Sequence, residues 1–205
     1  YLDKKGNPFT GILFSQATSD IGRIQCEYNN GKRHGEYIQD HAKKPDQILH
    51  TKYYKNGLKH GPDTVWWEKF KVGKNPKKKK YSDDSGVPPE IAGMMDQMTK
   101  SHDVMVETNF KDGVLHGKIV DYNWNGGINF EVNLKEGEKD GVWRQYFETP
   151  MGTGQGALKK ISIYKDDQHI SSKYYDFENA DITKEEALND EEWGGEAWEQ
   201  DTSFL

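Results

Sequence analysis

The phrase Tyr28-Asn-Asn-Gly-Lys-Arg-His-Gly35 returns as Tyr54-Lys-Asn-Gly-Leu-Lys-His-Gly61, as Phe110-Lys-Asp-Gly-Val-Leu-His-Gly117 and as Leu134-Lys-Glu-Gly-Glu-Lys-Asp-Gly141. Its eight positions are an aromatic residue or Leu, any residue, Asn, Asp or Glu, Gly, any two residues, His or Asp, and Gly. A phrase that recurs along a chain indicates one small structural unit stacked on copies of itself. Such stacks present an extended surface, which is typical of proteins that bind a partner.

The spacing of the copies leaves one question open. The second glycines lie at 35, 61, 117 and 141, and a weaker first copy ends at Gly11, so the gaps are 24, 26, 56 and 24 residues. The gap of 56 is either one long unit or two units, one of which has lost its phrase. A degenerate copy at residues 164–171 lacks both glycines, as expected of an end unit that faces water.

Each phrase predicts a tight hairpin. Asn30-Gly31, Asn56-Gly57 and Asp112-Gly113 are dipeptides that accept positive φ in two-residue turns. Alternating segments such as 23–28 and 128–134 flank them and predict strands buried on one side. The predicted fold is therefore mainly β: an elongated, single-layer antiparallel sheet of stacked hairpins, with a short helical insert and a short C-terminal helix. We expect structural turn roles for Gly31, Gly35, Gly57, Gly61, Gly113, Gly117, Gly137 and Gly141.

The composition favours a thin core. Apolar residues make up 33% of the 205 residues and mean hydropathy is -1.01, while aromatic residues reach 12%. Tyr, Trp and Phe bury much area each and keep a polar tip. No segment approaches the roughly 18 apolar residues of a membrane span. Cys26 has no cysteine to pair with, and it lies on the apolar face of its predicted strand.

Charge divides the chain into a repeat region, residues 1–177, and an acidic tail, residues 178–205. From Asp176 onward there are eleven acidic residues and one lysine, a net charge of -10, whereas the rest has 27 basic and 23 acidic residues, +4. Thr183-Lys-Glu-Glu186 is a capping box that predicts a short helix. Beyond it, Trp193 and Trp198 lie among acidic residues and dock either on the sheet of this protein or on a partner.

Residues 62–105 interrupt the repeats as an insert. Thr64-Val-Trp-Trp-Glu-Lys-Phe-Lys71 predicts a strand, and a lysine run follows at 77–80. Pro88 and Pro89 open an amphipathic helix near 88–100 that carries Ile91, Met94, Met95 and Met98 at helical spacing. This helix either caps the sheet or forms a Met-rich ridge for a partner.

The motifs of catalysis and metal binding are not evident in the sequence. His34, His60 and His116 occupy the same slot in successive hairpins, about 10 Å apart, too far to share an ion bound at about 2 Å. Asp140 takes the same slot, which favours a role in hydrogen-bonding local backbone. Residues 152–156 resemble a phosphate loop but precede a strand, so we interpret them as a hairpin insertion. We expect no catalytic residues, metal or cofactor, and the negative total charge argues against nucleic-acid binding.

The phrase resembles the MORN repeat, in the variant common in bacterial proteins. The second and third copies match it well, and Glu138-Lys-Asp-Gly-Val-Trp143 supplies the familiar Gly-x-Trp continuation. The resemblance covers residues 1–61 and 105–177, and leaves out the insert and the tail. It implies a binding protein, since bacterial relatives are often antitoxins or immunity proteins beside secreted toxins, including type VI lipase effectors. Others are surface or envelope proteins, and eukaryotic members are linked to membranes and scaffolding.

We therefore expect an immunity or antitoxin protein that binds and occludes a cognate toxin. Its contact residues are aromatic side chains and tail carboxylates: Trp66, Trp67, Trp124, Trp143, Tyr146, Trp193, Trp198, Glu191 and Glu192. The alternatives are a structural envelope protein and a module that binds a membrane surface through Lys69, Lys71, Lys74 and the run at 77–80. The chain begins at Tyr1 without Met. We expect a periplasmic or envelope location if a leader was removed, and a cytoplasmic one otherwise.

Overall fold

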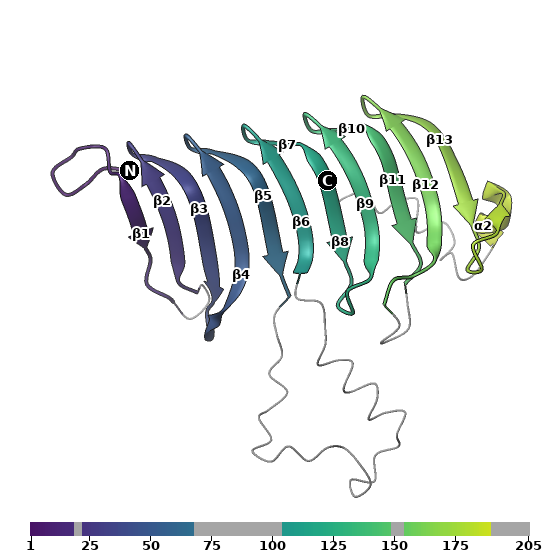
Figure 1. Ribbon diagram of the computed structural model, residues 1–205, viewed down its shortest axis with the longest axis horizontal. Coiled ribbons are helices and arrows are strands. Elements are labelled where there is room, and N and C mark those ends of the chain that lie inside the picture. Colours follow the sequence, from purple (N-terminus) through teal and green to yellow (C-terminus); the bar gives the residue numbers. More distant parts are fainter. Residues whose placement is uncertain (19–21, 68–103, 149–153, 190–205) are drawn as a thin grey trace, which may run out of the picture.

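The computed structural model describes residues 1–18, 22–67, 104–148 and 154–189 of the chain. They form a single open antiparallel sheet of 14 strands with one short C-terminal helix (Figure 1). The strands are β1 Gly11–Phe14, β2 Ile24–Asn29, β3 Lys32–His41, β4 Lys44–Lys55, β5 Leu58–Trp66, β6 Val104–Lys111, β7 Val114–Leu115, β8 Gly117–Tyr122, β9 Ile128–Lys135, β10 Glu138–Lys139, β11 Gly141–Tyr146, β12 Leu158–Lys165, β13 Gln168–Tyr175 and β14 Asp181–Ile182. The helix is α2, Lys184–Asn189.

The strands follow one another across the sheet in chain order. The path runs β1-β2-β3-β4-β5-β6-β8-β9-β11-β12-β13-β14, with β7 paired to β6 and β10 to β9. The phrase hairpins lie at one end of the strands, at the top of Figure 1, and the β3–β4 and β8–β9 connections lie at the other end. The predicted fold class, an elongated single-layer antiparallel sheet, is confirmed.

The gap of 56 residues is one long unit. β5 pairs directly with β6, from Gly61 opposite Phe110 to Trp66 opposite Val104. β5 ends and β6 begins at the strand ends opposite the phrase hairpins (Figure 1). The insert that we expected at 62–105 is therefore shorter, because residues 62–66 belong to β5 and residues 104–105 belong to β6. The strand that we expected over 64–71 ends at Trp66 as β5. The lysine run and the helix near 88–100 lie outside the described residues.

The two faces of the sheet differ. We call one the aromatic face, because the first position of each phrase lies on it: Tyr28, Tyr54, Phe110, Leu134 and Tyr164. Ile119, Val132, Leu134 and Trp143 form a buried cluster there, with Leu115, Phe130 and Tyr164 packed against it. The other, polar face carries an ion-pair network centred on Glu131. The clustered part of the core therefore lies on one side of a single layer.

Each unit aligns with the next through the phrase itself. The second glycine of one copy lies opposite the first position of the following copy: Gly11 and Tyr28, Gly35 and Tyr54, Gly61 and Phe110, Gly117 and Leu134, Gly141 and Tyr164. Position six lies over the next ring, since the Arg33 guanidinium carbon is 5.3 Å from the centroid of Tyr54 and Lys59 Nζ is 4.2 Å from that of Phe110. Where Leu134 replaces the ring, position six is Leu115, and both belong to the apolar cluster.

The C-terminal helix is part of the folded body. Thr183 and Glu186 form the predicted capping box, with the Glu186 amide donating to Thr183 Oγ1 at 3.1 Å and the Thr183 amide donating to Glu186 Oε2 at 2.7 Å. Ala187 of α2 is fully buried against Phe147, with Tyr174 packed beside them. The segment that we assigned to the tail from residue 178 thus begins with β14, which pairs with β13 in the sheet, and α2, which packs on the aromatic face.

Candidate functional site: a repeat scaffold with a cationic aromatic face

The phrase turns have the backbone that the sequence predicts. The residue before the first glycine has positive φ in each intact copy, as in Asn30 at 49° and Asn56 at 52°. Consecutive positive φ values match the twist of the flanking strands. Positive φ is also found at Gly31, Gly35, Gly57, Gly61, Gly113, Gly117, Gly137 and Gly141.

The second glycine sits in a β-bulge. Between the pairs Cys26–Tyr37 and Tyr28–Arg33, β2 advances two residues while β3 advances four, so β3 carries two extra residues. Bulges increase local twist and redirect side chains. In this hairpin, the bulge carries His34, which is the seventh residue of the phrase. We call this seventh position the slot.

The slot residue connects its own bulge to the turn of the next unit. The Asn56 amide donates to His34 Nδ1 at 3.4 Å, and the Glu136 amide donates to His116 Nδ1 at 3.3 Å. In the weak first copy, Thr10 takes the slot and its Oγ1 accepts from the Asn30 amide at 2.9 Å. The slot therefore hydrogen-bonds backbone, as expected, but the backbone belongs to the neighbouring repeat. Among the described residues, no group of three or more His, Cys, Asp or Glu is placed to hold a metal ion.

Removing one slot acceptor should loosen the joint between two units. His116→Ala leaves the Glu136 amide without its acceptor and should lower the free energy of unfolding by about 1 kcal/mol. His116→Asp should recover part of that loss, because Asp140 occupies the same slot in the next copy. Urea unfolding measures both changes, and amide exchange at Glu136 locates them. Equal losses for the two variants would contradict the acceptor role.

A buried ion-pair network lies on the aromatic face of the N-terminal half. Asp63 of β5 is 5% exposed. One of its oxygens contacts His50 Nε2 of β4, and the other accepts from Lys59 Nζ at 2.7 Å. Burial alone would raise the pKa of Asp63, but the hydrogen bonds from His50 and Lys59 outweigh it and hold the pKa below its ordinary value. Thr108 of β6 donates to the Asp63 carbonyl at 3.2 Å, so the network ties three strands together.

This network predicts an acid-sensitive part of the stability. The lowered pKa of Asp63 means that its contribution is complete above the pKa of the unfolded chain and is lost as pH falls through the folded value. Asp63→Asn should therefore cost about 1.5–3 kcal/mol at neutral pH and flatten the fall in stability below roughly pH 4. Urea unfolding across the acid range measures this. An unchanged pH profile in the variant would contradict it.

The predicted aromatic contact residues do not gather on one surface. Trp143 is 7% exposed in the core cluster of the aromatic face. Tyr146 lies near Glu131 on the polar face, where burial and then the Glu131 charge raise the pKa of its hydroxyl. Trp66, Trp67 and Trp124 are half-buried. Trp66 and Trp67 lie where β5 ends, and Trp124 lies in the β8–β9 connection, so all three are at the strand ends opposite the phrase hairpins. The tail residues Glu191, Glu192, Trp193 and Trp198, and the candidate lysines of the insert, lie outside the described residues.

The polar face holds a second charge network. Glu131 is 8% exposed and pairs with Lys118 Nζ at 2.5 Å and with Arg144 at 2.8 Å. Burial alone would raise the pKa of Glu131, but its bonds to Lys118 and Arg144 lower it. These partners join β8, β9 and β11, so the network stabilises the sheet.

A series of cations that we did not predict from the sequence lies over the rings of the aromatic face. In addition to Arg33 and Lys59, the distances from Nζ to the ring centroid are 5.0 Å for Lys52 on Tyr37, 4.5 Å for Lys139 on Trp143, 5.5 Å for Lys159 on Phe147 and 5.4 Å for Lys160 on Tyr174. Such contacts are attractive through the ring quadrupole. Position six of the phrase, which is basic in three of the four copies, is the signal that would have revealed part of this series.

Two of these cations are poorly solvated. Burial is the main cause that lowers the pKa of Lys52 and of Lys139. In the part of the chain that the structure describes, neither ammonium group forms an ion pair with a carboxylate. The aromatic face thus combines apolar area with a series of positive charges.

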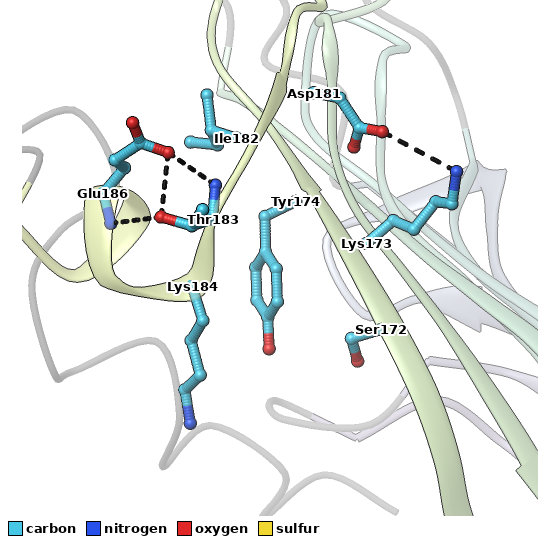
Figure 2. A pocket seen from close by; sticks show the side chains of 8 residues that line it. All are labelled: Ser172, Lys173, Tyr174, Asp181, Ile182, Thr183, Lys184 and Glu186. Carbon is cyan, nitrogen blue, oxygen red and sulfur yellow. Dashed lines mark hydrogen bonds and ion pairs between the residues drawn. The ribbon is translucent and has the colours of Figure 1, made fainter.

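A hollow of about 430 Å³ adjoins α2 at the C-terminal end of the sheet (Figure 2). Ser172 and Tyr174 of β13 form one wall, and Thr183, Lys184 and Glu186 form the other. Figure 2 shows the capping hydrogen bonds between Thr183 and Glu186 on the helix side. The hollow therefore opens where α2 meets the sheet.

Comparison of the sequence with protein-family models and with curated proteins found no match. Within the described ranges, no helix has the length and apolar character to cross a membrane.

Proposed function

We propose that this protein is a non-catalytic, MORN-type immunity or antitoxin protein that neutralises a secreted toxin by binding and occluding it. The observation that carries the proposal is the direct pairing of β5 with β6 across the connection 67–103. The sheet therefore keeps its strand pairing across this long connection. Recognition residues commonly occupy such connections on rigid frameworks.

The strand ends next to the insert carry aromatic side chains that could anchor a partner. Trp66 and Trp67 lie at the end of β5, and Trp124 lies in the β8–β9 connection, which is at the same end of the strands. Aromatic side chains that enter pockets dominate many interfaces. The acidic tail would speed the encounter with a basic toxin through long-range attraction. In this account the phrase hairpins at one end of the strands align the units, and the connections at the other end of the strands bind the toxin.

The test begins with affinity capture from a lysate of the source organism, using the full chain as bait and mass spectrometry to identify a stoichiometric partner. Calorimetry then compares the intact chain with a variant in which a short Gly/Ser linker replaces residues 68–103. We expect affinity to fall at least about 30-fold, the equivalent of one ~2 kcal/mol anchor, while the melting temperature stays unchanged. Unchanged affinity in the linker variant would remove the insert from the interface.

A structural envelope role is the second candidate, and the N-terminal edge favours it. Ile12 and Phe14 of β1 are 47% and 64% exposed. Among the described residues, no strand pairs with the outer side of β1. An uncharged edge strand invites pairing with another chain. Sedimentation of the purified protein distinguishes the candidates: concentration-dependent assembly without a foreign partner favours the structural role.

A further inference from the structure

The described part of the chain ends, with α2, on the aromatic face. Ala187 is fully buried against Phe147, and Tyr174 and Ile182 pack around them. Helix α2 ends at Asn189, two residues after Ala187. The hollow between β13 and α2 adjoins the same place (Figure 2).

The aromatic face next to α2 is cationic. Lys160 lies over Tyr174, Lys159 lies over Phe147, and Lys139 lies over Trp143. The Lys139 ammonium forms no ion pair within the described residues, and burial lowers its pKa. A lysine in this state gains from a carboxylate that is brought close to it.

The segment has the complementary chemistry. Residues 190–205 contain six acidic residues, no Lys or Arg, and the aromatic residues Trp193, Trp198 and Phe204. Sixteen extended residues reach about 50 Å, and strands are spaced about 4.8 Å apart. The segment is therefore long enough to cross β13, β12 and β11 and to reach Lys139.

We propose that residues 190–205 dock in cis on the aromatic face of the C-terminal repeats, with their carboxylates against Lys139, Lys159 and Lys160. The tryptophans add apolar contact with the rings of that face. Attachment at α2 gives the segment a high effective concentration at this surface, which favours the intramolecular occupant over a second copy. This docking does not depend on the identity of a partner.

Carbodiimide cross-linking of the purified full chain tests this docking. The reagent joins carboxylates to ammonium groups that are already in contact. Mass spectrometry of the monomer should find Glu191, Glu192, Glu196 or Glu199 joined to Lys139, Lys159 or Lys160, with a lower yield in high salt. Tail links that go only to Lys118 and Lys173 on the polar face, or only to residues 77–80 of the insert, would overturn the proposal. Links confined to dimers, or no tail links at all, would also overturn it.

Charge reversal gives a second readout on the same chain. Lys139→Glu and Lys160→Glu should each raise the rate at which a Glu-specific protease cleaves residues 190–205 by about three- to fivefold, as expected for loss of one ion pair. Lys173→Glu is the matched control, because its side chain is exposed on β13 but belongs to the polar face. Melting temperatures check that each variant is folded. Wild-type cleavage rates in both aromatic-face variants would overturn the proposal.

Discussion

Trp143→Ala should lower the free energy of unfolding by about 3–5 kcal/mol, the range for removing a large aromatic side chain from a core. Trp143 packs edge-on against Phe130 with centroids 6.4 Å apart, and its ring lies 5.8 Å from that of Tyr164. Ile119 and Val132 of the same cluster are 3% and 1% exposed. Because the sheet is a single layer, few neighbouring groups can collapse into the vacated space.

The indole nitrogen refines this expectation. Trp143 Nε1 is buried and makes no hydrogen bond with the described residues. Trp143→Phe should therefore cost much less than Trp143→Ala, since it keeps ring contacts and leaves no donor unpaired. Urea unfolding followed by circular dichroism measures both, with Trp124→Ala in the β8–β9 connection as the control. A Trp143→Ala loss no larger than that of the control would mean that the aromatic face is not the core.

Gly117→Val should cost about 2–3 kcal/mol, through the backbone. Gly117 is the first residue of β8 and has φ of 92°. A Cβ there would lie 3.7 Å from Asn109 Cβ, an ordinary contact, so space is not the obstacle. The cost arises because a β-branched L residue does not accept this φ. If this φ relaxed to a negative value, the bulge would move and the pairing of Gly117 in β8 with Leu134 in β9 would change.

The degenerate last copy supplies the control. Ser171 occupies position eight of that copy, where the other copies have the second glycine, and its φ is not positive. In that hairpin the bulge shrinks, since Tyr164 pairs with His169 and Ile163 with Ser171. Ser171→Val should change stability by less than about 0.5 kcal/mol. If the two substitutions cost the same, the positive φ of the bulge is not what the phrase encodes.

Local chemistry explains what could be predicted from the sequence. The Asn30-Gly31 turn depends on two adjacent residues, and the capping box depends on Thr183 and Glu186, three positions apart. The alternation of Ile128, Phe130 and Val132 is enough to define one face of β9. These signals act over a few residues, so the hairpins, the single layer and the short helix follow from them.

The contacts between units could not be predicted in the same way. Which backbone His116 binds depends on the register between β8 and the next hairpin, and the partner, Glu136, is 20 residues away. Trp143 looked like a contact residue because aromatic residues anchor interfaces. Its place in the core follows only when β11 is set against β9, with Arg144 opposite Glu131. The cation series has the same origin, since Lys59 meets Phe110 across an insert that hides their proximity.

The boundary of the acidic tail shows how composition misleads. Charge divides the chain near residue 176, but packing continues through Ala187 of α2. A deletion from residue 178 would therefore remove β14 and α2 and damage the fold. Experiments on the tail should keep the chain through Asn189 and alter only residues 190–205.

A growth assay in cells tests the central claim, neutralisation of a toxin by binding, most directly. The captured partner is expressed alone, with the intact chain, and with the linker variant of residues 68–103. Our account predicts growth arrest by the partner alone, rescue by the intact chain and loss of rescue with the linker variant. A partner that is harmless when expressed alone, or a toxin that the intact chain binds without restoring growth, would contradict it.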